Sequence, residues 1–481
     1  MRILQKDAHQ AGHRSAQPSL RSGAENLNCD EWRAFQATDK REVVEAVPQW
    51  TWLQRLGFRL LFTIAGGSVI VTGGVMLLVT VYAGVVHAGG GRYPFEPAIW
   101  VLAQIGSYLT RGRGVDITRS PAGDVLWTWC FQLGWTVVAL LITAVWTAMD
   151  RRRPNYRSLA ASLLVFARFS LALVMIYYGV GKVIPVQMGY MALPHHQLQL
   201  VGDTGLFATL WDFVGASEPY SVAIGLVELL SGVFLLWNRT WLLGALFAVI
   251  ATTQIFLLNL TYDVPVKLVS GQLFLVAIGI TSPYWSNLAR VVFNRGETRP
   301  VQLWPPLGSG APLLRRTGVV AKFGAAAMLL AIAGPGGVMA YAAYHTPSST
   351  LDGVWCATSF TVDGRESNLN DTSPQPWTNV AITDRKSVPG HGVVMFVSQV
   401  PSGYTTRWHL KIDGDRLELR KRLADSTQMV LFATQPDKNR LILVGEVDGR
   451  RVEGTFERRF MERSKSSFRL ISPPIPMESV W

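Results

Sequence analysis

Seven long apolar stretches set the strongest limit on what this chain can fold into. Crossing the hydrocarbon core of a bilayer takes about 20 mainly apolar residues as an α-helix. The stretches that meet this length lie at 58–86, 125–148, 159–183, 219–237, 241–260, 265–283 and 318–341. A long polar segment precedes the first stretch, so we do not expect it to be a secretory signal peptide. We therefore expect a multi-pass helical membrane protein.

Composition and charge agree with a protein embedded in a lipid bilayer. Only 16% of the residues are charged, against about a quarter in soluble proteins. The net charge is +12, and most of the excess falls in 56–341, which holds 19 Lys and Arg against 10 Asp and Glu. A positive excess between membrane spans reports topology. We therefore exclude nucleic acid as a partner.

The distribution of Lys and Arg among the short links predicts the orientation. Links 150–157 and 290–316 are rich in arginine, whereas 183–218 contains neither Lys nor Arg. By the positive-inside rule, the N-terminus is inside and the C-terminal region is outside. The loop 87–123 departs from this pattern because it should be external yet carries four arginines. Its apolar patch 99–109 indicates an interfacial or re-entrant helix.

The C-terminal region has the alternating pattern of an antiparallel β domain. The expected strands lie at 354–362, 377–382, 392–398, 405–412, 416–421, 428–433, 440–446 and 452–459. Asp413-Gly414 and Asp448-Gly449 are typical hairpin turns. Eight consecutive strands favour an up-and-down barrel or a strongly curved sheet, and the opening Gly353-Val354-Trp355 is similar to the start of lipocalin-type barrels. Trp355 then either plugs one end of a filled barrel or borders a ligand-binding interior.

These patterns divide the chain into a membrane region with two flanking regions. The expected divisions are a mostly disordered cytoplasmic tail at 1–55, two transmembrane helices with a long external loop at 56–157, a four-helix membrane bundle at 158–295, a cytoplasmic link and a seventh transmembrane helix at 296–345, an external β domain at 346–472 and a tail at 473–481.

Charged residues inside a bilayer are costly, so they face the bundle interior and mark function or an internal pair. Arg168, Tyr178 and Lys182 share one face of the helix at 159–183, at 100° per residue. Arg168 is expected near the midplane and Lys182 at the outer end. Glu228 lies at the centre of its own helix. We expect an Arg168–Glu228 pair, with Gln254 nearby.

A second polar layer is expected at the outer mouth of the bundle. Its members are Tyr178, Lys182, Asn259, Tyr262, Asp263 and Lys267. His195 and His196, with Gln187 and Gln197 in the external loop, are placed to cover this layer. Both layers have two interpretations. They are either structural ion pairs that fix helix register, or a site for the polar or redox-active headgroup of a ligand. No metal site is expected, since the histidine pair has no evident third ligand.

Several of these segments together resemble the DoxX-like family of integral membrane proteins. The likeness is carried by Arg168, the run YYGVGK at 177–182, Gln187, GLVELLSGVFLLWNRT at 225–240 and LNLTYDVPVKL at 258–268, and it covers roughly 160–295. It implies a four-helix bundle in the bacterial inner membrane. Some relatives are membrane subunits of thiosulfate:quinone oxidoreductases or are linked to thiol redox homeostasis. The chain departs from longer members at its end, SPPIPMESVW, and no catalytic residue carries over.

Three functions are compatible with the sequence. The first is a redox-associated inner-membrane protein that binds a quinone or a similar amphiphile beside Arg168, Tyr178, Lys182, Gln187, Glu228, Asn259, Tyr262, Asp263 and Lys267, and works with a periplasmic redox protein. The second is a transporter for a small solute or proton, with Glu228 and Arg168 as a relay. The third is a scaffold that presents the external domain to a partner. The sequence does not decide whether the protein is an enzyme.

Overall fold

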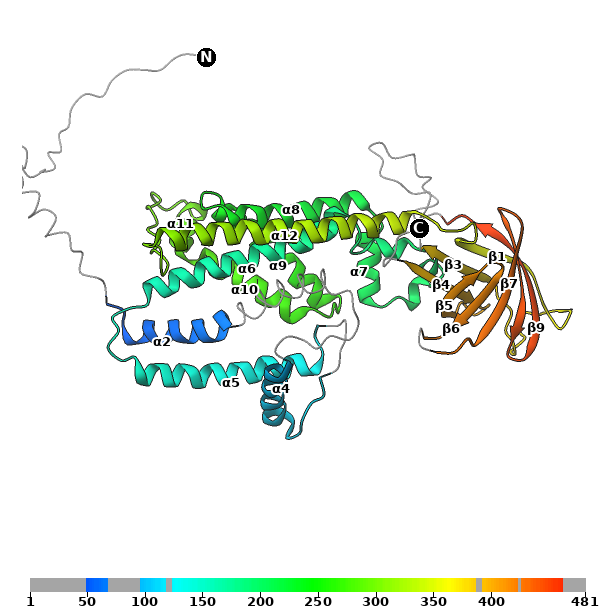
Figure 1. Cartoon of the computed structure of the whole chain (residues 1–481), viewed down its shortest axis with the longest axis horizontal. Helices are drawn as coiled ribbons and strands as arrows, with labels where there is room; N and C mark the ends of the chain where they lie inside the picture. The colour runs from blue at the N-terminus through cyan, green and yellow to red at the C-terminus, as the bar shows by residue number, and fades with distance from the viewer. Residues whose placement is uncertain (1–48, 68–95, 118–122, 386–391, 423–424, 462–481) are drawn as a thin grey trace, which may run out of the picture. The chain divides into compact units, whose positions relative to one another are not determined.

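Six helices in the described part of the chain are long and apolar enough to cross a membrane (Figure 1). The computed structural model describes residues 49–67, 96–117, 123–385, 392–422 and 425–461. The spans are α5 (Leu126–Met149), α6 (Arg157–Val183), α8 (Glu218–Leu236), α9 (Trp241–Thr261), Lys267–Val292 and α12 (Pro312–His345). Lys267–Val292 comprises α10 (Lys267–Thr281), a short 3-10 turn and α11 (Trp285–Val292). These spans confirm the six expected stretches from residue 125 onward.

The first expected stretch, 58–86, is only partly described. Its beginning lies in α2 (Trp52–Leu61) and in a π-helical turn at Phe62–Gly66, and its remainder from residue 68 lies outside the described residues. The same holds for most of the expected tail at 1–55 and for the tail at 473–481. In one compact unit, which joins residues up to Arg55 with Arg152–Asn155, the Trp50 amide donates to the Pro154 carbonyl at 2.9 Å.

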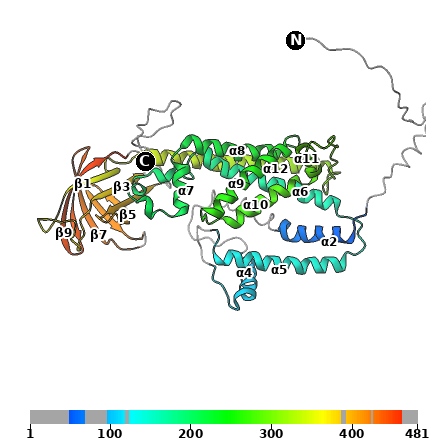
Figure 2. The ribbon, with the colours of Figure 1, turned by 180° about the vertical axis from the view of Figure 1, so that it is seen from behind.

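α6 and α8 pack against each other along most of their lengths, and α9, α10 and α12 complete the bundle. Figure 1 and Figure 2 show these helices side by side. Glycines allow the close approach: a Cβ at Gly179, Gly225 or Gly232 would lie 2.6–2.7 Å from atoms of the opposite helix. Such small residues let membrane helices pack backbone to backbone. The α6–α8 contact therefore has a fixed register, and the candidate site lies across it.

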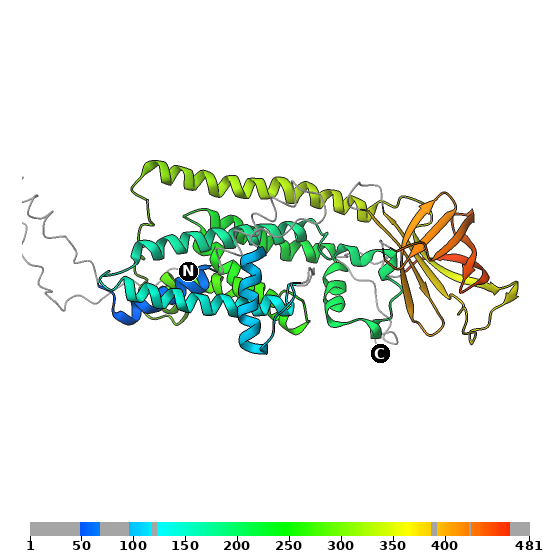
Figure 3. The ribbon, with the colours of Figure 1, turned by 60° about the horizontal axis from the view of Figure 1, so that its bottom comes forward.

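The apolar patch at 99–109 forms the helix α4 (Glu96–Arg111), which packs against α5. Figure 3 shows α4 crossing α5. Gly106 and Gly134 make the crossing possible, because a Cβ on either would overlap a backbone carbonyl of the other helix. The expected helix is thus confirmed, and its interfacial or re-entrant position stays a prediction.

The C-terminal region is a closed barrel of eight antiparallel strands. The strands are β1 (Gly353–Val362), β3 (Asn379–Arg385), β4 (Val393–Gln399), β5 (Thr405–Asp413), β6 (Arg416–Arg420), β7 (Met429–Asp437), β8 (Arg440–Val447) and β9 (Arg450–Arg459). Each pairs with the next, and β1 pairs with β9 to close the barrel. The short strand β2 (Arg365–Glu366) extends β1 through a hairpin. All eight expected strands are confirmed.

The barrel is built around its own side chains. Trp355, Phe396 and Phe456 are completely buried in one apolar cluster with leucines from β6, β7 and β8. The Trp355 indole donates to the Leu351 carbonyl at 2.9 Å, and the Arg458 guanidinium covers its ring at 4.2 Å. The interpretation of Trp355 as a plug for a filled barrel is therefore confirmed, as expected for a small barrel.

Residues 184–217, between α6 and α8, contain three short 3-10 turns and the helix α7 (Leu206–Gly215). This segment contacts the outer face of the barrel, where Leu198 is buried with Val354, Ala381 and Val397. Gln399 of β4 donates to the Leu198 carbonyl at 2.8 Å. The contact is specific because it combines a buried apolar cluster with a buried hydrogen bond.

Candidate functional site

A buried ion pair joins the last turn of α6 to the central part of α8. The Lys182 Nζ atom lies 2.8 Å from Glu228 Oε2, and the two side chains are 8% and 4% exposed. Gly225 on α8 packs directly against Lys182, with no side chain between them, and the Ser221 hydroxyl donates to the Lys182 carbonyl at 3.1 Å. The close α6–α8 register thus places these opposite charges against each other in an apolar environment.

Tyr178 lies one turn before Lys182 on α6, and its ring centroid is 5.6 Å from the Lys182 ammonium. Within the residues that the structure describes, neither the Tyr178 hydroxyl nor Glu228 Oε1 forms a hydrogen bond, and Lys182 uses only one of its three N–H donors. Both of these oxygens retain accessible surface. Donors and acceptors for a polar ligand therefore remain at the ion pair.

The expected Arg168–Glu228 pair is wrong. Arg168 Nη2 instead donates to Asn238 Oδ1 at 2.7 Å, in the link between α8 and α9. Arg168 and Lys182 are 14 residues apart, or about 21 Å along a helix, so Glu228 reaches only Lys182. Arg168 thus lies at the α8–α9 link, and its expected depth near the midplane stays a prediction. Gln254, expected beside the pair, is exposed on α9.

The outer polar layer is confirmed only in part. Lys267 and Asp263 form an ion pair of 2.7 Å, but the Asp263 side chain is 81% exposed. Asn259 is buried and accepts the Val264 amide through its backbone carbonyl at 3.1 Å. Tyr262 packs in a separate apolar cluster with Val264. In the described residues, no hydrogen bond or ion pair links this group to Lys182 and Glu228, so the two are distinct.

Sequence reasoning missed the residue that organises this outer group. Asp124, just before α5, accepts the Lys267 amide and, at 3.1 Å, the Leu268 amide. These are the first amides of α10, which lack partners inside the helix. A carboxylate at a helix N-terminus also interacts favourably with the helix dipole. The partner lies 143 residues away in the sequence, so no local capping pattern could have revealed it.

The expected cover of histidines and glutamines is wrong for His195. Its backbone amide and its Nδ1 atom lie 3.1 and 2.9 Å from the Thr383 hydroxyl of β3, so it faces the barrel. Burial, with the nearby His196 and Arg407, lowers the His195 pKa to about 3. Gln197 bonds within the same segment, to the Ala192 carbonyl at 2.5 Å. Gln187 lies just after α6, where its backbone amide donates to the Gly181 carbonyl at 3.1 Å.

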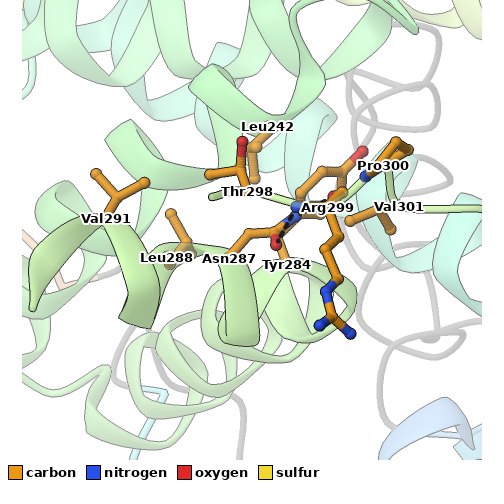
Figure 4. A pocket seen from close by; sticks show the side chains of 9 residues that line it. All are labelled: Leu242, Tyr284, Asn287, Leu288, Val291, Thr298, Arg299, Pro300 and Val301. Carbon is orange, nitrogen blue, oxygen red and sulfur yellow. Dashed lines mark hydrogen bonds between the residues drawn. The ribbon is translucent and has the colours of Figure 1, made fainter. Parts of the chain in front are cut away.

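In the described part of the chain, no group of three or more His, Cys, Asp or Glu side chains is arranged so that it could hold a metal ion. A pocket of about 510 Å³ lies elsewhere, between the start of α9, α11 and residues 298–301. Figure 4 shows its lining side chains and the bond from Asn287 to the Arg299 backbone. The pocket contains none of the candidate residues, so it does not mark the predicted site.

The apolar helices and the closed barrel define a multi-pass membrane protein with a C-terminal β-barrel domain. Over 127 residues the chain is 30% identical to the uncharacterised protein YwoB of Bacillus subtilis (strain 168). The aligned region is 26% of this chain and 77% of YwoB, so the chain belongs to the same family as YwoB. No family model and no solved structure matches the chain.

Proposed function

We propose that this protein is a DoxX-like protein of the bacterial inner membrane that binds the headgroup of a quinone or similar amphiphile beside Lys182, Glu228 and Tyr178. The segments 177–182, 225–240 and 258–268 that resemble DoxX-like proteins support this proposal. Two of them contribute the buried ion pair. A quinone carbonyl accepts hydrogen bonds and a quinol hydroxyl donates them, which suits a site with both donors and acceptors.

The observation that carries the proposal is the unused hydrogen-bonding capacity of the buried ion pair. A purely structural pair in an apolar bundle gains most when every remaining donor and acceptor is satisfied. Here the Tyr178 hydroxyl and one Glu228 oxygen have no partner among the described residues. Both oxygens remain accessible, so a ligand headgroup can reach them and supply the missing bonds.

The distribution of arginine supports the proposed orientation. The link 293–311 and the flanking turns of α11 and α12 carry Arg290, Arg295, Arg299, Arg315 and Arg316. Residues 184–217 carry no Lys or Arg, and this segment contacts the barrel. By the positive-inside rule the arginine-rich link is cytoplasmic and the barrel is periplasmic. A periplasmic redox protein is then the partner that we propose for the barrel side.

Quinone titration of the purified protein tests the proposed function. We expect saturable binding of a short-chain ubiquinone or menaquinone to the wild type, followed by tryptophan fluorescence. Tyr178→Phe removes one hydroxyl and nothing else, so it should weaken binding about tenfold. Gln254→Ala, an exposed change on α9, is the matched control. If the wild type binds no quinone while it remains folded, the proposal is wrong.

The scaffold function is the second candidate, because one specific observation favours it. The barrel is filled by its own side chains and is attached to the membrane region at several points. Arg385 of β3 contacts Asp352 in a bidentate ion pair and also donates to the Tyr344 carbonyl of α12 at 2.9 Å. A rigidly held domain suits presentation to a partner. A folded protein that binds no quinone would favour this function over the first.

A further inference from the structure

A second buried charge lies in the bundle, separate from the Lys182–Glu228 pair. Arg168 on α6 is only 7% exposed. Its guanidinium contacts two neutral groups, the Asn238 amide oxygen at 2.7 Å and the Trp241 ring at 5.6 Å. Within the residues that the structure describes, no carboxylate pairs with Arg168. The Nε and Nη1 atoms of Arg168 form no hydrogen bond with the described residues, and both retain accessible surface.

Lys322 on α12 brings a second cation to the same place. The next residue, Phe323, packs edge-on against Trp237 at 5.1 Å, and Trp237 directly precedes Asn238. The helix turn that carries Lys322 therefore packs against the α8–α9 link, whose Asn238 binds Arg168. In the described part of the chain, neither Arg168 nor Lys322 forms an ion pair with a carboxylate. Unpaired cations are unfavourable in an apolar bundle, and a bound anion would offset that cost.

The surface around the two cations identifies the kind of anion. Trp237 and Val319 are 50% and 49% exposed. Apolar side chains at a membrane helix surface face lipid, so an anion that reaches this site from the bilayer carries an apolar tail. Arginine holds the oxygens of a phosphate through paired, charge-assisted hydrogen bonds. Clusters of basic residues attract anionic lipids.

We propose that Arg168 and Lys322 bind the phosphate of an anionic phospholipid, whose acyl chains lie along the apolar surface of Trp237 and Val319. This site is independent of the proposed quinone site, because Arg168 lies at the α8–α9 link, far along α6 from Lys182. Arg168 forms the buried part of the site, and Lys322 forms its half-buried rim.

Native mass spectrometry of the full-length protein in detergent tests this site with phosphatidylglycerol and phosphatidylcholine as probes. We expect the wild type to retain phosphatidylglycerol in preference to phosphatidylcholine. Lys322→Gln removes the rim cation with little effect on folding and should weaken phosphatidylglycerol binding about tenfold. Arg168→Gln should weaken it further. Arg295→Gln, an exposed change on the 293–311 link, should leave it unchanged.

Two results would overturn the proposal. The first is equal affinity of the wild type and Lys322→Gln for phosphatidylglycerol, or an equal loss in Arg295→Gln, which would indicate nonspecific attraction. The second is displacement of the lipid by inorganic phosphate at comparable concentration. That result would identify a site for the free anion and exclude the phospholipid as its occupant.

Discussion

At the scale of single residues, the stability of the bundle should depend on keeping both members of the Lys182–Glu228 ion pair. Both side chains are almost fully buried, with Nζ and Oε2 2.8 Å apart. Removing one partner leaves an uncompensated charge in an apolar bundle, which costs about 3–5 kcal/mol. We therefore expect Glu228→Leu to lower the free energy of unfolding by that amount, measured by denaturant unfolding in detergent micelles.

The double variant Lys182→Met, Glu228→Leu is the decisive control. Replacing both members of a buried pair by apolar side chains is often neutral or stabilising, so the double variant should recover most of the lost stability. It should nevertheless lose quinone binding, because the proposed headgroup contacts are gone. Losses that simply add in the double variant would show that the two side chains do not act as a pair.

Residue types could be predicted from the sequence more reliably than their partners. Scarcity of charge in the membrane region identified Arg168, Lys182 and Glu228 as buried, and the structure confirms this. The Arg168–Glu228 pairing was wrong because helix depth was judged from sequence alone. Gly225 and Gly232 fix the α6–α8 register by backbone contact, and that register depends on three-dimensional packing.

At the scale of elements, the α6–α8 contact should tolerate no added side chain. A Cβ at Gly225 would lie 2.7 Å from the Lys182 Cβ and the Val183 amide nitrogen. Overpacking of this kind costs about 1–3 kcal/mol, so Gly225→Ala should lower the unfolding midpoint. Gly318→Ala on α12, where a Cβ meets nothing within 4 Å, should be neutral or slightly stabilising. Equal effects of the two changes would contradict the close contact.

The start of α10 should depend on the carboxylate that caps it. Asp124 accepts the amides of Lys267 and Leu268. Loss of a capping side chain costs about 0.5–2 kcal/mol, so Asp124→Ala should destabilise the protein within that range and increase hydrogen exchange at the start of α10. Asp116→Ala, an exposed change between α4 and α5, is the matched control. Unchanged exchange at α10 would contradict the capping role.

Sequence patterns predicted helices and strands more reliably than any other feature. Apolar length predicted each of the six described spans, and alternation predicted all eight barrel strands. The strand β2 has only two residues and carries no pattern of its own. The helix α7 is ten residues long, too short for the length criterion of a membrane span.

At the scale of the whole molecule, the contact between residues 184–203 and the barrel should depend on pH. The His195 pKa is about 3 in the folded protein, against about 6.5 for a free histidine. The unfolded chain therefore binds a proton that the folded protein excludes. This contribution to stability is present above pH 6.5 and is lost as the pH falls toward 3.

Between pH 8 and pH 5 the loss attributable to His195 is about 2 kcal/mol. We expect His195→Gln to remove that part of the pH dependence, measured as the unfolding free energy of the two proteins at both values. The other titrating groups are common to both proteins and cancel in the comparison. Identical pH dependence of the wild type and the variant would show that His195 is not buried against Thr383.

Contacts between segments that are far apart in the sequence were the hardest feature to predict. His195 and Thr383 are 188 residues apart, and neither carries a local pattern that indicates the other. From the sequence, we expected His195 and His196 to cover the outer polar layer, because that layer was the nearest group of polar residues in the chain. The barrel offered a buried hydroxyl and an apolar face at Val354, Ala381 and Val397, and these determine where the segment packs.

The central claim is that an amphiphile headgroup binds beside Tyr178, Lys182 and Glu228. The most direct measurement is crosslinking of the full-length protein in membranes with a photoreactive quinone analogue, followed by peptide mapping. The account predicts labels in 177–183 of α6 or 225–232 of α8, reduced by excess unlabelled quinone and by Tyr178→Phe. Labels confined to other segments, such as the pocket at α11 and 298–301, would contradict it.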